Sequence, residues 1–306
     1  MDIVMNTHQI AVGIAGAGVW AGRVHIPALQ ADPRFRIVGI WARRFDQAEL
    51  LGERFGVKPT ADFDQLVDAA DVVDFAVPPA AQPALALKAA RQGRHLILEK
   101  PVGVDVTVLE ELRSVVVARR LATRVFVQRF FDPTRLAMMR ALAAEPWTRA
   151  RSEWWSSAYL PGNPFATPWR DANAVLYDIG PHSISQLEAI LGNVQEGVMV
   201  ARTATSVALV VRHVGGAESE VLIDVGADVP SMRESLTLWT PTAQHQPVLE
   251  DVQTHAAFGR LLDRLVTDMA DPENQPDDRS GLADGIRMVR LLNELAGSWR
   301  EPMRQG

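Results

Sequence analysis

Hydrophobic and polar positions follow two different patterns along this chain, and the change falls near residue 132. Before it, short apolar runs of strand length alternate with longer segments whose apolar positions recur at helical spacing. The expected strands cover residues 9–15, 35–41, 71–77, 95–98 and 123–128, and the expected helices cover 19–31, 46–55, 63–69, 80–92 and 104–120. Because the strands are almost continuously apolar and helices separate them, this part predicts a doubly wound parallel sheet covered on both faces.

After residue 132, strand patterns follow one another with few helices between them. Gly215 and Gly216 predict one hairpin, and residues 234–248 predict another that turns near Pro241. The expected helices cover residues 133–144, 172–191, 254–269 and 280–299, and the expected strands lie within 148–155, 198–225 and 234–248. This order predicts an α+β domain built on a mostly antiparallel open sheet. We therefore expect two domains, residues 1–128 and 129–306.

Composition narrows the classes of function. A length of 306 residues suits two domains, and a net charge of -6 without a basic run argues against nucleic-acid or membrane partners. The chain has no cysteine, which excludes disulfides and thiolate metal sites, and we expect no metal. Its N-terminal apolar stretch is broken by glycines and no segment is long enough to span a bilayer, so we expect a soluble, cytoplasmic protein.

A glycine loop follows the first expected strand and opens a helix. Gly16, Gly18 and Ala21 have the spacing G-x-G-x-x-A, with Val19 and Trp20 inside the motif. This spacing allows a tight turn and brings the backbone close to a pyrophosphate at a helix N-terminus. The loop predicts a dinucleotide site; the alternative is a glycine-rich turn in an unrelated α/β protein.

The end of the second expected strand bears on the choice of dinucleotide. An NAD site usually has a carboxylate there to bind the ribose 2′-hydroxyl. Asp46 comes too late in this chain, and Arg43 and Arg44 precede it. Guanidinium groups suit a 2′-phosphate, so we expect NADP in preference to NAD. The alternative is that both arginines are only solvated at a helix start.

The fourth expected strand ends in Glu99, Lys100 and Pro101, and Lys100 is one of only three lysines in the chain. Ligands of doubly wound sheets lie beyond the carboxyl ends of the strands. The Lys100 ammonium could therefore bond and polarise a substrate hydroxyl, while Glu99 and Pro101 fix the turn. A plain surface charge is the alternative for a single lysine.

Asp178 and His182 lie four residues apart in an expected helix. If the helix continues through Pro181, both side chains share one face. A histidine can exchange a proton near neutral pH, and a carboxylate beside it can orient the ring. The alternative is a capping aspartate and a structural histidine.

The order of these motifs, from GAGVWAGRVHIPAL (16–29) through EKP and VQRFFDP (127–133) to D-x-G-x-H, resembles the Gfo/Idh/MocA oxidoreductase family over nearly the whole chain. The resemblance implies a Rossmann domain followed by a substrate-binding and oligomerisation domain, and a homodimer or homotetramer formed through the open sheet. It also implies hydride transfer between NADP or NAD and a sugar, a cyclitol or a related polyol or carbonyl compound.

The resemblance further implies roles for single residues. Lys100, Asp178 and His182 would be catalytic, with His182 as the acid/base. The implied cofactor-binding residues are Gly16, Gly18, Val19, Trp20, Arg43, Arg44, Pro78, Glu99, Lys100, Gln128 and Arg170.

Departures from the family pattern leave other functions open. They occur at Gln82, Phe130, Ala172, Asn173, Ala174 and Ser185. Trp147, Trp154, Trp155 and Trp169 could pack on a sugar ring, or serve the core and interfaces. The alternatives are a dehydrogenase for a small aromatic diol, and a dinucleotide-binding sensor without turnover.

Overall fold

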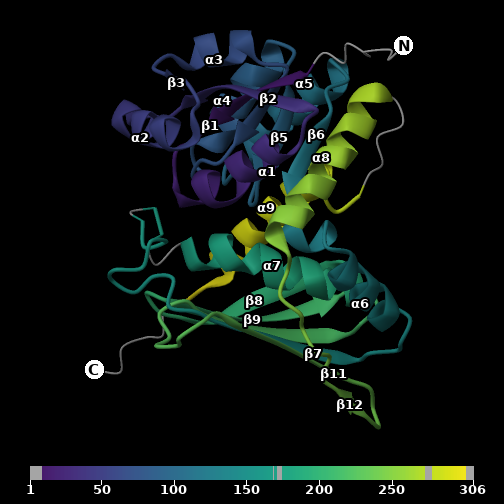
Figure 1. The fold of residues 1–306 in the computed structure, drawn as a ribbon. Coiled ribbons are helices and arrows are strands. Elements are labelled where there is room, and N and C mark those ends of the chain that lie inside the picture. Colours follow the sequence, from purple (N-terminus) through teal and green to yellow (C-terminus); the bar gives the residue numbers. More distant parts are fainter. Residues whose placement is uncertain (1–8, 168, 171–173, 273–277, 301–306) are drawn as a thin grey trace, which may run out of the picture. The chain divides into compact units, whose positions relative to one another are not determined.

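A computed structural model describes residues 9–167, 169–170, 174–272 and 278–300. The chain forms two compact units, of which the first comprises residues 1–132 and 253–286 and the second residues 133–252 and 287–306. Helix α8 (Thr254–Ala270), expected from the sequence in the second domain, packs instead within the first unit against α1 (Ile26–Ala31) and β6 (Thr123–Phe126) (Figure 1). Periodicity predicted the apolar face of this helix, but it carries no information on which sheet that face covers.

The first unit contains a six-stranded parallel sheet with the order β3-β2-β1-β4-β5-β6. Its strands are β1 (Ile10–Ala15), β2 (Phe35–Trp41), β3 (Pro59–Thr60), β4 (Val72–Phe75), β5 (His95–Glu99) and β6. Chain order reverses between β1 and β4, which is the switch point where doubly wound sheets bind ligands. The predicted sheet is confirmed, and the two-residue β3 is the strand that the sequence analysis missed.

Helices connect these strands, as the pattern predicted. They are α1, α2 (Phe45–Phe55), α3 (Phe63–Ala69), α4 (Gln82–Arg91) and α5 (Val106–Ala118). Asp62 and Asp105 cap α3 and α5 by accepting backbone N–H bonds, which explains where these helices begin.

The helix expected over residues 19–31 is not regular. It opens with a π-helical turn, η1 (Ala21–His25), and only then continues as α1. Pro27 has no N–H to donate to the Arg23 carbonyl, and the ring Nε2 of His255 in α8 bonds that carbonyl at 2.7 Å instead.

The second unit contains a six-stranded sheet with the order β12-β11-β7-β10-β9-β8. Its strands are β7 (Arg149–Trp155), β8 (Val194–Arg202), β9 (Ser206–His213), β10 (Glu218–Asp224), β11 (Arg233–Trp239) and β12 (Gln244–His245). Both predicted hairpins are present, as β9–β10 and β11–β12. The sheet is mostly antiparallel, as predicted, but its central strands β7 and β10 pair in parallel.

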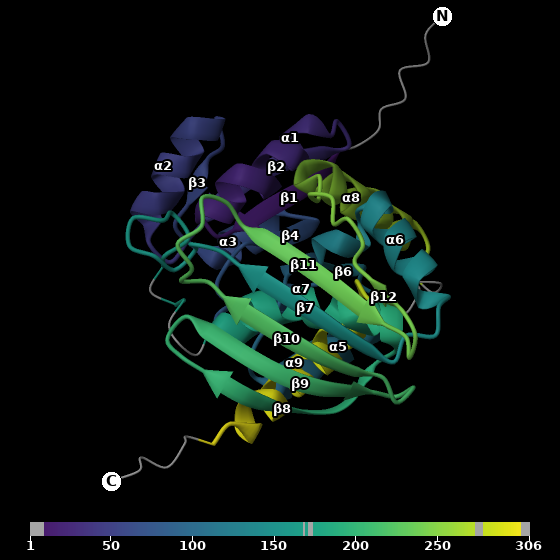
Figure 2. The same ribbon diagram turned by 90° about the horizontal axis from the view of Figure 1, so that it is seen from below.

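Helix α7 (Ala174–Leu191) packs against β7, β9 and β10 and lies behind the sheet in Figure 2. Helix α6 (Pro133–Ala143) packs on α7, and the division between the two units falls within α9 (Leu282–Ser298). On the opposite face of this sheet, Figure 2 shows no helix formed by the described residues of the second unit. None of the helices in the described ranges is both long enough and apolar enough to cross a bilayer.

Candidate active site

The glycine loop connects β1 to η1 and is shaped by the absence of side chains. Gly16 has a φ of +125°, and a Cβ there would lie 2.3 Å from the Ala76 carbonyl oxygen, so only glycine fits. Its N–H donates to the Trp41 carbonyl at 2.7 Å, which holds the loop against the end of β2. A Cβ on Gly18 would meet no heavy atom within 4 Å. The loop is therefore fixed on one side and open on the other, which fits a phosphate group approaching the backbone.

We expect Gly16→Val to destabilise the protein by about 3–5 kcal/mol, because the side chain would clash with the backbone at Ala76 and adopt a strained φ. Urea unfolding would measure this loss, and nicotinamide fluorescence would measure the accompanying loss of dinucleotide binding. Gly18→Ala is the matched control, since its methyl group enters open space. The control should keep its stability within about 1 kcal/mol of wild type while weakening dinucleotide binding. Equal stability of Gly16→Val and wild type would contradict this account of the loop.

Two arginines occupy the short turn between β2 and α2. Arg43 and Arg44 are exposed, and Arg44 is the extended N-cap residue of α2. Asp46 lies within the first helical turn, where a hydrogen bond from Gln47 and the charge of Arg44 lower the pKa of its carboxyl. The turn between the strand end and the helix thus exposes two cationic side chains.

Gln82 fixes the backbone of the EKP segment from α4. Its side-chain Nε2 donates to the Glu99 carbonyl at 2.8 Å, and its Oε1 accepts the Glu99 N–H at 2.9 Å. The Lys100 N–H then donates to Oε2 of Glu99 at 3.2 Å. In the sequence, Gln82 stands out only as a departure from the family pattern. Its fully buried amide instead binds both backbone polar groups of Glu99, the residue before Lys100.

Four of the predicted cofactor residues follow adjacent parallel strands. Gly16, Pro78, Lys100 and Gln128 come after β1, β4, β5 and β6, respectively, and so lie along one edge of the sheet. The Pro78 carbonyl accepts the N–H groups of Ala81 and Gln82 in the turn into α4. Gln128 begins a 3-10 turn, η2 (Gln128–Phe130), and accepts a hydrogen bond from the Thr254 hydroxyl at 3.1 Å. The departure at Phe130 ends this turn and is half-buried.

The second unit contains the predicted aspartate–histidine pair. Helix α7 continues through Pro181, so Asp178 and His182 lie about one turn apart, and each is 6% exposed. Trp154 of β7 stacks on the His182 ring, with centroids 5.6 Å apart and planes 10° apart. This indole packs on the histidine, a contact that the sequence analysis did not predict because the two residues lie in separate elements. It fixes the plane of the imidazole ring.

Arg170 pairs with Asp178. Its Nε donates to Oδ2 of Asp178 at 2.7 Å, and its guanidinium lies over the Trp169 ring at 4.4 Å. The family resemblance implied a place for Arg170 beside the cofactor, and this contact with the aspartate was not predicted. Of the departures near this pair, Ser185 bonds the His182 carbonyl at 3.4 Å and Ala174 begins α7. Ala172 and Asn173 lie outside the described residues.

The parallel sheet, its switch point between β1 and β4 and the glycine loop define a dinucleotide-binding domain of the Rossmann class. Residues 10–128 match the model of the Gfo/Idh/MocA family, described as an oxidoreductase family with an NAD-binding Rossmann fold. This match covers the first of the two predicted domains and agrees there with the resemblance that the motifs indicate.

The chain is also similar to individual proteins, one by sequence and two by structure. A dTDP-3,4-didehydro-2,6-dideoxy-alpha-D-glucose 3-reductase of Actinomadura kijaniata is 36% identical over 123 residues, which cover 40% of this chain and 37% of that protein. Among solved structures, the 3-ketoreductase KijD10 of Actinomadura kijaniata, in complex with TDP-benzene and NADP, has a TM-score of 0.76 and 19% identity over 96% of this chain and 98% of its own. GenD2 from gentamicin A biosynthesis, in complex with NAD, has a TM-score of 0.79 and 18% identity over 95% and 94% of the two chains. The structural matches show the shared two-part fold.

Proposed function

We propose that this protein is an NAD(P)-dependent oxidoreductase that transfers hydride between nicotinamide and a sugar-like alcohol or carbonyl compound. The observation that carries the proposal is the edge of the first sheet, where the glycine loop follows β1 and Lys100 follows β5, with β4 between the two strands, in a domain that matches an NAD-binding family. The sugar-nucleotide reductase among its relatives supports a sugar or sugar derivative as the substrate. A cyclitol or another polyol falls within the same proposal.

The chain's own residues would bind the dinucleotide and manage charge and protons. The bound nicotinamide supplies or accepts the hydride. The open glycine backbone would bind the pyrophosphate. Lys100, held at the end of β5, would stabilise negative charge on the substrate oxygen, and His182, aligned by Trp154, would give or take the proton. Asp178, paired with Arg170, would orient this histidine or a substrate hydroxyl.

We propose NADP as the preferred cofactor, because Arg43 and Arg44 are exposed beside the loop end of β2. Replacing Arg43 with alanine should weaken NADPH binding about 10- to 100-fold, as expected for losing a charge-assisted hydrogen bond to a phosphate. The affinity for NADH should change less than about twofold, since NADH lacks that phosphate. Fluorescence titration of both cofactors would measure the two affinities.

Arg36 provides the matched control for this titration. It is an exposed arginine near the start of β2, at the other end of the strand. Arg36→Ala removes the same charge and should leave both affinities as in wild type. A wild-type protein that binds NADH more tightly than NADPH would overturn the preference for NADP and leave the oxidoreductase proposal intact.

A sensor on the same fold is the competing function, and a dehydrogenase for a small aromatic diol is a competing substrate class. Steady-state turnover with panels of sugars, cyclitols and aromatic diols separates them. Tight dinucleotide binding without turnover of any panel member would favour the sensor.

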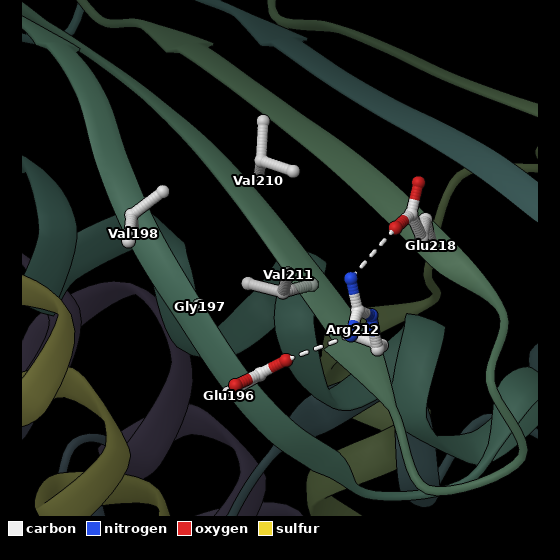
Figure 3. Close-up of a pocket in the computed structure, with 7 residues that line it drawn as sticks. All are labelled: Glu196, Gly197, Val198, Val210, Val211, Arg212 and Glu218. Atoms are coloured by element: carbon white, nitrogen blue, oxygen red, sulfur yellow. Dashed lines mark hydrogen bonds and ion pairs between the residues drawn. The ribbon is translucent and has the colours of Figure 1, made fainter.

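We also propose that a second copy of the chain covers the helix-free face of the second sheet. Val198, Val200 and Val210 are exposed on β8 and β9. Arg212 lies between Glu196 and Glu218, 3.0 Å from the first carboxylate and 3.3 Å from the second, in the shallow pocket of Figure 3. Apolar side chains flanked by both signs of charge suit a symmetric partner. Sedimentation equilibrium showing only the monomer mass at micromolar concentration would contradict this assembly.

A further inference from the structure

A buried cluster of three titratable side chains joins η1 to β4 and β5 within the first unit. His25 and Asp74 are both 0% exposed, and Nδ1 of the histidine lies 2.9 Å from each carboxylate oxygen of Asp74. The other ring nitrogen, Nε2, lies 3.1 Å from Oε1 of Glu99. The aromatic rings of Phe126 and Phe258 enclose the imidazole at centroid distances of 6.1 and 4.6 Å.

The geometry fits a positively charged ring. Each ring nitrogen of His25 faces carboxylate oxygens, and only the imidazolium form has a proton to donate from both nitrogens. Burial lowers the pKa of His25, but the charge of Asp74 and the hydrogen bonds to Asp74 and Glu99 outweigh it and raise the pKa to about 10. Burial also raises the pKa of Asp74, against the opposing charge of His25.

Glu99 connects this cluster to the candidate active site. Its Oε1 accepts a second hydrogen bond, at 2.8 Å, from the indole Nε1 of Trp20 in the glycine loop. Its Oε2 accepts the backbone N–H of Lys100 at 3.2 Å. One carboxylate thus joins the dinucleotide loop, the buried histidine and the backbone of the lysine.

We propose that His25 is a positioning residue for Lys100: the imidazolium, anchored by Asp74, holds the Glu99 carboxylate in the orientation that bonds the Lys100 N–H. Charge-assisted hydrogen bonds are the strong ones, and a neutral ring would lose one of its two donors. With the imidazolium present, the cluster carries one positive and two negative charges. Without it, both carboxylates are uncompensated, and Glu99, at 12% side-chain exposure, can rotate toward the Lys100 ammonium and compete with the substrate for it.

The proposed role of His25 needs no metal ion. In the described part of the chain, no group of three or more histidine and carboxylate side chains, this cluster included, has an arrangement that could hold a metal ion. A purely structural role would tie η1 to the sheet and affect stability alone. The positioning role differs because it predicts an effect on Lys100 in the folded protein.

The first test observes the wild-type protein and needs no substrate. With ¹⁵N-labelled histidine, NMR at pH 8 should show both ring nitrogens of His25 protonated, whereas an ordinary histidine is neutral at that pH. The His25 signals are assigned by their loss in His25→Gln, or by their shift in Trp20→Phe if that variant does not fold. A neutral His25 ring at pH 8 would overturn the proposal.

The second test uses the small number of lysines. A protein labelled with ¹⁵N-lysine gives backbone signals from Lys58, Lys88 and Lys100 only. His25→Gln should shift the Lys100 amide signal and lower its protection from hydrogen exchange, and leave the other two signals in place. If His25→Gln does not fold, Glu99→Gln, which keeps the shape of the side chain and removes its charge, should shift the Lys100 signal in the same way. An unmoved Lys100 signal in the folded variant would overturn the proposal.

The third test rests on the proposed oxidoreductase function. In folded His25→Gln, kcat should fall about tenfold or more, because Lys100 is displaced, while KM for the dinucleotide changes less than about threefold. A lower melting temperature with an unchanged kcat would show that His25 has only a structural role and would contradict the positioning role. If the wild-type protein itself shows no turnover, the proposed function fails, and the two NMR tests still decide whether His25 positions Lys100.

Discussion

Replacing Lys100 with methionine is expected to lower kcat by about a thousandfold, because under the proposed function the substrate oxygen would lose the cation that stabilises its developing charge. Methionine keeps a long flexible side chain. The hydrogen bonds from the Glu99 N–H to Gln82 and from the Lys100 N–H to Glu99 do not involve the ammonium group. Binding of the dinucleotide should therefore change less than about threefold. Steady-state kinetics with an identified substrate and fluorescence titration with NADPH would measure the two effects.

Lys88 provides the matched control for this experiment. Its ammonium lies 2.6 Å from Asp64, and both side chains are about half exposed, at 48% and 47%. Surface ion pairs of this kind contribute about 0–1 kcal/mol, so Lys88→Met should keep wild-type kcat and nearly wild-type stability. A kcat for Lys100→Met within about tenfold of wild type would show that Lys100 is not a catalytic residue.

Replacing His182 with asparagine should lower kcat by about a hundred- to a thousandfold, because asparagine cannot exchange a proton near neutral pH. The variant should also lose the pH dependence that an acid/base histidine gives to kcat. The contact with Trp154 would weaken as well, so a modest loss of stability is expected. Kinetics across pH 5–9 and thermal unfolding would separate the two effects.

His213 is the control for a buried histidine in the same unit. It is 0% exposed, with Nδ1 2.6 Å from the Gly192 carbonyl oxygen and Nε2 2.8 Å from the Ser219 hydroxyl. Burial lowers the pKa of His213, although the bond to Gly192 and the charge of Glu188 oppose this shift. His213→Asn should cost about 1–3 kcal/mol of stability and leave kcat unchanged. If His182→Asn behaves in the same way, the histidine of α7 is structural.

Local patterns predicted most of the first sheet, because a strand buried on both faces must be almost continuously apolar. The observed β2 and α3 coincide with the predicted ranges, and the strand ends place Lys100 correctly after β5. The same patterns predicted α7 through Pro181 and both hairpins of the second sheet. These patterns could not predict that β7 and β10 pair in parallel, since strand periodicity is the same for both directions of pairing.

The candidate site also divides into features that local patterns predict and contacts that they do not. The sequence by itself determined the fold class and where the candidate site residues fall along the chain, because the glycine spacing, the strand-end lysine and the aspartate–histidine pair are local motifs. Only the tertiary structure decided what supports those residues. Gln82 bonds the Glu99 backbone, Trp154 stacks on His182, and His25 joins Asp74 to Glu99, each pair lying in separate elements. Such contacts depend on how helices and strands pack, and spacing along the chain does not encode that packing.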